Sequence, residues 1–214
     1  MDNVRLVVFD LDGTLVDAYP AIIASFNHTM AALGYPRRSD RVIKRAVGWG
    51  DRNLLRPFVS SASLETALAV YRRHHAHSLA VKSRLYPRVK RLLRLLKNKG
   101  VILAVATNRP TRFSHILLRH LGIKKFFKAV VCGDAITHGK PHPQILNVIM
   151  RRLQVKPGET IYVGDMYIDV QTGKRAHVFT VALTTGSSSR SELRRQRPGR
   201  ILDAVWDVRR LVSA

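Results

Sequence analysis

Two carboxylates, those of Asp10 and Asp12, lie one residue apart near the start of the chain, and Gly13 and Thr14 follow them. They come directly after an apolar run at 6–9, which is typical of a strand buried on both faces of a parallel sheet. Two acids at the carboxyl end of such a strand do not serve packing, because burying a charge costs free energy. We therefore interpret them as candidates for chemistry.

Polar side chains follow three later apolar runs in the same way. They are Thr107, Asn108 and Arg109 after the second run, Lys140 after the third, and Asp165 and Asp169 after the fourth. Ligands of open α/β sheets bind at the carboxyl ends of the strands. A hydroxyl group, a lysine and four carboxylates, counting Asp10 and Asp12, are thus expected to converge from distant parts of the chain.

This set of residue types has a definite chemistry. Carboxylates that meet at one point repel each other and raise their own pKa values unless a cation neutralises them. A small number of hard oxygen ligands selects Mg²⁺. A hydroxyl group, backbone N–H groups and a lysine can donate hydrogen bonds to a phosphoryl group, and helix N-termini add positive potential. The residues therefore predict a Mg²⁺ site built for phosphoryl transfer.

The runs that position these residues alternate with helical patterns. Apolar segments with the length of strands lie at 5–9, 101–106, 129–132, 160–163 and 178–183. Segments with helical periodicity, bounded by glycine or proline, lie between them at 88–99, 111–121 and 143–153. This alternation predicts an α/β fold with a doubly wound, Rossmann-like parallel sheet.

The segment at 17–83 interrupts the alternation, because it holds no convincing strand. Two long helical patterns occupy 20–33 and 62–81 instead. We predict an α/β core domain built from 1–16 and 84–214, with a helical cap domain inserted at 17–83.

The composition excludes several classes of protein. The chain is 46% hydrophobic and therefore globular, and no apolar stretch approaches the roughly 20 residues that a membrane-spanning helix needs. The N-terminal residues lack the pattern of a secretory signal. The single cysteine, Cys132, cannot form a disulfide within the chain. We expect a cytoplasmic protein without a membrane partner.

The chain is strongly basic, with 37 Lys and Arg against 14 Asp and Glu and a net charge of +23. Basic residues gather around the leucines at 88–99 and again at 194–200. Such clusters bind phosphate backbones without sequence preference, so a nucleic-acid partner is the alternative hypothesis. The charge is nevertheless spread along the whole chain, which favours attraction of a small phosphorylated substrate and only non-specific binding of nucleic acid.

Four motifs are similar, in identity and order, to those of the haloacid dehalogenase-like phosphatases. They are DLDGT at 10–14, TN at 107–108, KPHP at 140–143 and GDMYID at 164–169. VGWG at 47–50 and TTGSSSRSEL at 184–193 resemble the phosphoglycolate phosphatase-like branch of that superfamily. Asp12 distinguishes the chain from dehalogenases and phosphonatases, and Leu11 from P-type ATPases, whereas sugar phosphomutases are harder to exclude.

The resemblance implies catalytic roles for residues of these motifs. Asp10 would be the nucleophile that becomes a transient aspartyl phosphate. Asp12 would protonate the leaving alcohol and then activate water. Thr107 and the backbone around Asn108 would hold the phosphoryl oxygens, and Lys140 would balance the negative charge of Asp10 and the phosphate.

The same resemblance implies a Mg²⁺ site. Asp10, Asp165 and the backbone carbonyl of Asp12 would ligate the ion, and Asp169 would be either a ligand or a support for one. The expected activity is Mg²⁺-dependent hydrolysis of a phosphate monoester.

Residues of the cap would recognise the leaving group. Arg45, Trp49 and Arg52 lie around the turn at 48–50 and, with Arg109, are our candidates for substrate binding. A cap arginine suits a small anionic ester such as phosphoglycolate, and it suits pyrophosphate or a nucleotide equally well. A pyrophosphatase, a nucleotidase, a sugar phosphatase or phosphomutase, and a protein acting on nucleic-acid phosphate ends are therefore the alternatives.

Three histidines, His74, His75 and His77, suggest a metal site at first sight. They lie in a predicted cap helix, His74 and His75 fall on different faces of it, and no acid or cysteine is nearby in the sequence. We interpret them as a surface cluster.

Overall fold

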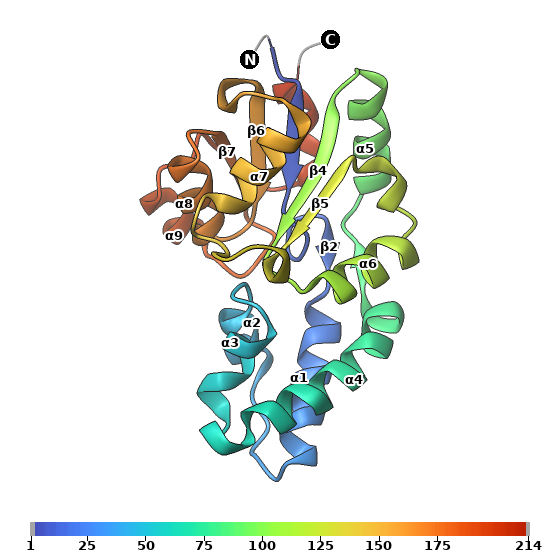
Figure 1. Cartoon of the computed structure of the whole chain (residues 1–214), viewed down its shortest axis with the longest axis vertical. Coiled ribbons are helices and arrows are strands. Elements are labelled where there is room, and N and C mark those ends of the chain that lie inside the picture. Colours follow the sequence, from blue (N-terminus) through green and yellow to red (C-terminus); the bar gives the residue numbers. More distant parts are fainter. Residues whose placement is uncertain (1–2, 213–214) are drawn as a thin grey trace.

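The computed structural model describes residues 3–212 and has two parts, an α/β domain and a group of helices (Figure 1). The α/β domain, here called the core, holds the first and the last of the described residues. The helices of the other part, here called the cap, lie below the core in this view. In the described residues, no helix combines the length and the apolar character that crossing a bilayer requires.

The core is built on a parallel sheet whose strands, within 3–212, follow the order β5-β4-β1-β6-β7-β8. These strands are β1 (Leu6–Phe9), β4 (Ile102–Thr107), β5 (Ala129–Cys132), β6 (Thr160–Gly164), β7 (Phe179–Leu183) and β8 (Arg200–Leu202). β1 pairs with β4 on one side and β6 on the other, and its four residues are all buried. The predicted α/β fold with a parallel sheet is confirmed.

β8 is a strand that the sequence pattern does not predict. It is three residues long and pairs with β7 at the edge of the sheet. Arg200 is exposed, and Ile201 and Leu202 are only half-buried. The segment therefore lacks the continuous apolar run that marks the inner strands, and its pairing with β7 makes it a strand.

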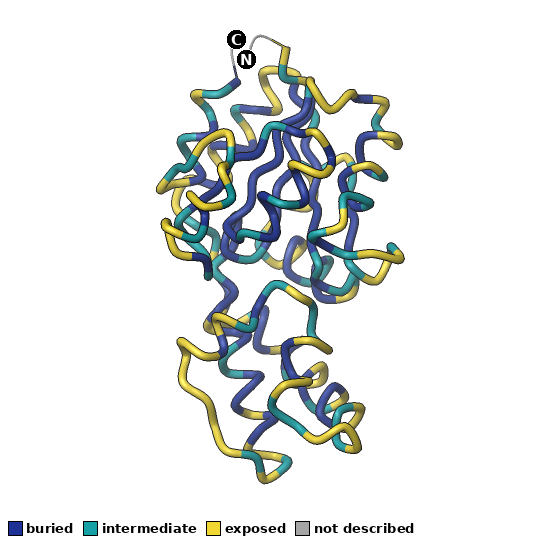
Figure 2. Tube along the Cα trace, turned by 90° about the vertical axis from the view of Figure 1, so that its left-hand side faces the viewer, coloured by how far each residue is buried: buried dark blue, intermediate teal, exposed yellow. Residues whose placement is uncertain are grey.

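Helices cover both faces of the sheet, because alternate residues of a strand point to opposite sides. Val7 and Phe9 share an apolar cluster with α5 and α6, whereas Leu6 and Val8 share one with α7. The core helices are α5 (Val89–Asn98), α6 (Thr111–His120), α7 (Gln144–Leu153), α8 (Tyr167–Arg175) and α9 (Arg190–Arg195). Figure 2 shows the buried strands inside and most exposed residues on the outer surface.

The cap is helical, as the sequence predicts. Its helices are α1 (Tyr19–Ala32), α2 (Asp40–Ala46), α3 (Asp51–Leu55) and α4 (Leu64–Lys82). α1 and α4 pack against each other, with Phe26 and Met30 of α1 and Leu68 and Leu79 of α4 buried in one apolar interior. Short 3₁₀ helices lie in the cap at Arg56–Phe58 and Ser61–Ser63. Others lie in the core at Lys124–Phe126, Gly133–Ala135, Pro157–Glu159 and Val205–Leu211.

A two-stranded antiparallel ribbon joins the cap to the core. It is formed by β2 (Val16–Asp17) and β3 (Arg84–Leu85), so the chain leaves and re-enters the core at one place. Asp17, the first residue of the predicted cap, lies in β2, and Ser83, the last, directly precedes β3, and the domain limits themselves stay a prediction. The first and second strands of the core can therefore lie side by side although about 90 residues separate them.

Candidate active site

The carboxyl end of β1 carries Asp10 into the site. Its backbone N–H continues the strand pairing with a bond of 2.8 Å to the carbonyl oxygen of Val163. The chain then turns at Gly13, whose φ is +80° and where a Cβ would collide with the carboxylate of Asp165. The hydroxyl of Thr14 donates to Asp165 Oδ1 at 2.9 Å. This segment thus places its own acids and also holds the acid that follows β6.

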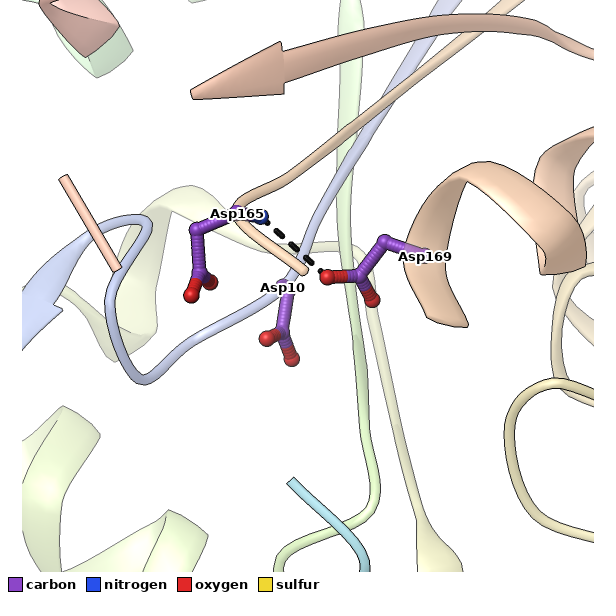
Figure 3. A group of neighbouring side chains, drawn as sticks. All are labelled: Asp10, Asp165 and Asp169. Carbon is purple, nitrogen blue, oxygen red and sulfur yellow. Dashed lines mark hydrogen bonds between the residues drawn. The ribbon is translucent and has the colours of Figure 1, made fainter. Parts of the chain in front are cut away.

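Three buried carboxylates meet here, those of Asp10, Asp165 and Asp169 (Figure 3). Asp165 follows β6, and Asp169 lies in the first turn of α8. One oxygen of each carboxylate lies within 4.8 Å of an oxygen of both others. Figure 3 shows Asp10 between the other two, with the backbone N–H of Asp165 donating to Asp169. The structure therefore brings together the three acids that the motifs single out for a metal.

Both carboxylate oxygens of Asp169 are already occupied by donors. Oδ1 accepts from Lys140 Nζ at 2.7 Å and from the Tyr162 hydroxyl at 2.7 Å. Oδ2 accepts from the backbone N–H groups of Asp165 at 3.2 Å and Met166 at 2.9 Å. Asp169 thus holds the lysine and the loop that carries Asp165.

Lys140 lies between two of the acids. Its Nζ is 2.8 Å from Asp10 Oδ1 and 2.7 Å from Asp169 Oδ1. Apart from this ion pair, the buried Oδ1 of Asp10 has no hydrogen-bond partner. Burial opposes the charge on Lys140, but Asp10 and Asp169 outweigh burial and raise the pKa of the ammonium group.

The electrostatics of the cluster favour the uptake of positive charge. Burial raises the pKa of Asp10 to about 7, and the neighbouring Asp169 adds to the shift. Burial, Asp169 and Asp10 raise the pKa of Asp165 well above its ordinary range. When ionised, the three carboxylates beside one ammonium group carry two negative charges in excess. A divalent cation would balance that excess.

The carboxylate of Asp12 pairs with Arg109. The Arg109 Nε donates to Asp12 Oδ2 and the Nη2 to Asp12 Oδ1, both at 2.8 Å. Arg109 is itself buried. The pair is bidentate, the geometry that best fits a guanidinium to a carboxylate, and it fixes the plane of the Asp12 carboxylate.

The end of β4 supplies a hydroxyl and an amide. The hydroxyl of buried Thr107 accepts the backbone N–H of Arg109 at 3.2 Å. The Asn108 side chain donates to the carbonyl oxygens of Gly48 at 2.8 Å and Lys140 at 3.1 Å, and it accepts the N–H of Lys140 at 2.8 Å. Asn108 therefore ties the turn of the cap to the loop that carries the lysine.

A cavity between the core and the cap opens onto Asp10. Its core side includes Asp10, Asp12, Thr107, Asn108, Arg109 and Lys140. Its cap side includes Ile22, Val47, Leu54 and Tyr71, together with the polar side chains of Asp51 and His75. The lysine and arginine that line it are Lys140 and Arg109. A ligand would therefore meet charges on the core side and mainly apolar atoms on the cap side.

The similarity to one enzyme family extends over most of the chain. The profile of the haloacid dehalogenase-like hydrolases matches residues 7–183. The chain belongs to this family. The matched segment runs from β1 to β7 and includes the cap, so the resemblance seen in the motifs is confirmed.

Several proteins named phosphoglycolate phosphatases are similar along nearly the whole chain. A phosphoglycolate phosphatase of Pseudomonas putida is 35% identical over 97% of this chain and 78% of its own. A phosphoglycolate phosphatase of Vibrio parahaemolyticus is 33% identical over 99% of this chain and 97% of its own. The crystal structure of a predicted phosphoglycolate phosphatase from Haemophilus somnus has a TM-score of 0.93 at 27% identity and covers 99% of both chains.

The structure does not bring the predicted cap residues to the cavity of this hydrolase. Arg45 is exposed, and its guanidinium pairs with Glu192 of α9 at 2.6 Å, across the boundary between cap and core. Arg52 pairs with Glu65 inside the cap, and Trp49 is 37% exposed. Trp49 and Arg52 line an open groove that adjoins the cavity. Their role in substrate binding stays a prediction.

The interpretation of the histidines as a surface cluster is wrong for His75. His75 is 2% exposed and lines the cavity, whereas His77 is exposed and His74 is half-buried. A signal was present in the sequence, because His75 lies four residues after Tyr71 and four before Leu79, on the apolar face of α4. The packing of α4 on α1 of the cap and on α6 of the core buries this face.

Proposed function

We propose that this hydrolase is a Mg²⁺-dependent phosphatase that acts on a small phosphate monoester through a phosphorylated Asp10. The observation that carries the proposal is the buried cluster of Asp10, Asp165 and Asp169 beside the single ammonium group of Lys140. Phosphoryl transfer needs a nucleophile, a proton donor for the leaving group, and cations that neutralise the developing charge. The cavity offers a group for each need.

The residues fit a bound Mg²⁺ ion. Apart from its ion pair with Lys140, Asp10 Oδ1 is buried without a hydrogen-bond partner, and the excess charge of the cluster equals that of one such ion. Asp169 accepts hydrogen bonds on both oxygens, so we infer that it supports the site. Asp10, Asp165 and the backbone carbonyl of Asp12 would hold the ion. When bound, Mg²⁺ would neutralise the carboxylates and polarise the phosphoryl oxygens.

The reaction would proceed in two displacements at phosphorus. In the first, an oxygen of Asp10 bonds to phosphorus as the bond to the leaving oxygen breaks, and Asp12, which enters this step protonated, gives that oxygen its proton and becomes a carboxylate. In the second, Asp12 takes a proton from a water molecule, whose oxygen displaces Asp10 and releases inorganic phosphate. The Thr107 hydroxyl accepts from the Arg109 backbone and can therefore give its own proton to a phosphoryl oxygen.

Phosphoglycolate is the best single candidate for the substrate. Relatives at 35% and 33% identity are named phosphoglycolate phosphatases. A carboxylate in the leaving group needs a cation, and the guanidinium of Arg109 lines the cavity and has N–H donors beyond those that bind Asp12 and His75. The mainly apolar cap side, with Ile22, Val47 and Leu54, suits a small leaving group better than a sugar or a nucleotide.

A panel of phosphate esters tests the proposed function. Phosphoglycolate, pyrophosphate, a sugar phosphate, a nucleotide and a 5′-phosphorylated oligonucleotide would be assayed with Mg²⁺ and with excess chelator. We expect release of phosphate only with Mg²⁺, and the highest kcat/KM for phosphoglycolate. Full activity in chelator would exclude the metal site, and a preference for the oligonucleotide would give the basic surface a part in catalysis.

Two expectations from the composition stay predictions. The basic surface is expected to bind nucleic acid without sequence preference and to release it as salt rises. The single cysteine is consistent with a cytoplasmic location. Neither expectation enters the argument for the reaction.

The stabilising effect of Mg²⁺ is expected to grow with pH. Burial raises the pKa of Asp10 from 3.8 to about 7 in the folded protein without a cation. A raised pKa means that the contribution of Asp10 to stability is complete below about pH 4 and is lost as the pH rises through 7. Mg²⁺ would bind the ionised carboxylate and restore that loss.

Thermal unfolding with and without Mg²⁺ measures this effect. We expect Mg²⁺ to raise the melting temperature by roughly 5 °C at about pH 8 and by little at about pH 5. Ca²⁺-free, chelator-treated protein is the reference at both pH values. Equal shifts at the two pH values would contradict the assignment of Asp10 as a ligand.

A further inference from the structure

A buried histidine has no role in the reaction described above. His75 lies in α4, and its ring stacks on Tyr71 with 4.8 Å between centroids and meets Phe113 edge-on at 5.2 Å. Phe113 belongs to α6 of the core, against which α4 packs (Figure 1). The ring is therefore clamped between a cap residue and a core residue.

The hydrogen bonds of His75 identify its tautomer. Arg109 Nη1 lies 2.8 Å from His75 Nε2, and because a guanidinium can only donate, Nε2 is the acceptor. His75 Nδ1 lies 3.0 Å from Ser25 Oγ. The Ser25 hydroxyl donates its own proton to the carbonyl oxygen of Ala21 at 2.8 Å. Nδ1 therefore carries the proton. Burial and the charge of Arg109 lower the pKa of His75 well below its ordinary value, which agrees with a neutral ring.

His75 adds a third side-chain hydrogen bond to the Arg109 guanidinium. Nε and Nη2 hold Asp12, and Nη1 is held by His75. The guanidinium is planar, so a partner on each of its three nitrogens fixes its position and its plane. Without His75, the Arg109 guanidinium and the Asp12 carboxylate would be hydrogen-bonded only to each other. The two groups could then turn together.

We propose that His75 is a positioning residue for the proton shuttle: it fixes Arg109, and Arg109 fixes the carboxyl group of Asp12. The inference rests on the proposed function, because it assigns Asp12 the proton transfers. His75 belongs to the cap, whereas Arg109 and Asp12 belong to the core. The proton shuttle is thereby aligned only while α4 is seated on the core, which couples the cap to the chemical step.

Two substitutions of His75 separate the acceptor from the packing. His75→Phe keeps an aromatic ring between Tyr71 and Phe113 but removes the acceptor for Arg109. We expect it to lower kcat for phosphoglycolate about thirtyfold and to change KM by less than about twofold. His75→Gln carries an amide oxygen that can reach the position of Nε2, and we expect it to stay within about fivefold of wild-type kcat.

A matched control lies next to His75 on the same helix. His74 Nδ1 is also 3.0 Å from Ser25 Oγ, but the ring stacks on His28 and lies outside the lining of the cavity. His74→Phe should therefore leave kcat within about twofold of wild type. If His74→Phe and His75→Phe lower kcat equally, the effect comes from the packing of α4 and the inference is wrong.

A double-mutant cycle tests whether His75 acts through Arg109. Arg109→Leu removes the guanidinium, so adding His75→Phe to it should change single-turnover rates by less than about twofold. A full additional loss would overturn the inference. If wild type hydrolyses no ester, the proposed function fails; if wild type is active and His75→Phe is as fast, only the role of His75 fails.

Discussion

Asp10→Asn is expected to abolish turnover, with a loss of at least about a thousandfold, or roughly 4 kcal/mol of barrier. The amide has the size of the carboxylate but cannot form the aspartyl phosphate. The fold should survive, because the substitution removes a buried negative charge. Burial raises the pKa of Asp10 to about 7, so the wild-type protein in chelator loses stability as the pH rises through that value, whereas the amide does not ionise.

Steady-state assays and thermal unfolding check both parts of this expectation. In chelator at about pH 8, Asp10→Asn should melt at the same temperature as wild type or higher, although it is inactive. Asp203→Asn is the control, because Asp203 is a carboxylate whose side chain is 74% exposed. Turnover by Asp10→Asn above about a tenth of wild type, which corresponds to a rise of less than roughly 1.4 kcal/mol in the barrier, would refute the assignment of Asp10 as the nucleophile.

Lys140→Met is expected to damage both stability and activity. The Lys140 side chain is 3% exposed and is the ammonium group beside Asp10 and Asp169, so its loss leaves buried carboxylates without that partner. Removing one member of a buried ion pair typically costs about 3 kcal/mol. We expect a loss of that order in the free energy of unfolding in chelator. Turnover should fall at least about a hundredfold, because the phosphate and Asp10 lose a balancing charge.

Denaturant unfolding and steady-state kinetics show whether the effect of Lys140→Met is specific to this lysine or follows from the loss of any lysine. Lys174→Met on α8 is the control, since Lys174 is exposed and should change stability by less than about 0.5 kcal/mol. Mg²⁺ should recover part of the lost stability, because it supplies positive charge to the same carboxylates. A Lys140→Met protein as stable and as active as the control would exclude Lys140 from the site.

The strands of the core could be predicted because their signal is local. The inner strands are short apolar runs, and glycine or proline separates them from the helices. Asp10, Thr107 and Asp165 each stand at the end of such a run. The carboxyl ends of parallel strands meet at one edge of the sheet, so their convergence follows from the alternation of strands and helices. β8 was not predicted because its pairing with β7, and not an apolar run, makes it a strand.

The sequence by itself therefore determined the fold class, the family and the set of acids that meet. The tertiary structure decided which partner each charged group has. Asp12 pairs with Arg109 over a separation of 97 residues, and Arg45 pairs with Glu192 over 147. A hydrogen bond depends on distances of about 3 Å and on direction, neither of which leaves a trace in the local pattern. His75 received its acceptor role only when the packing of α4 on α6 carried it to Arg109.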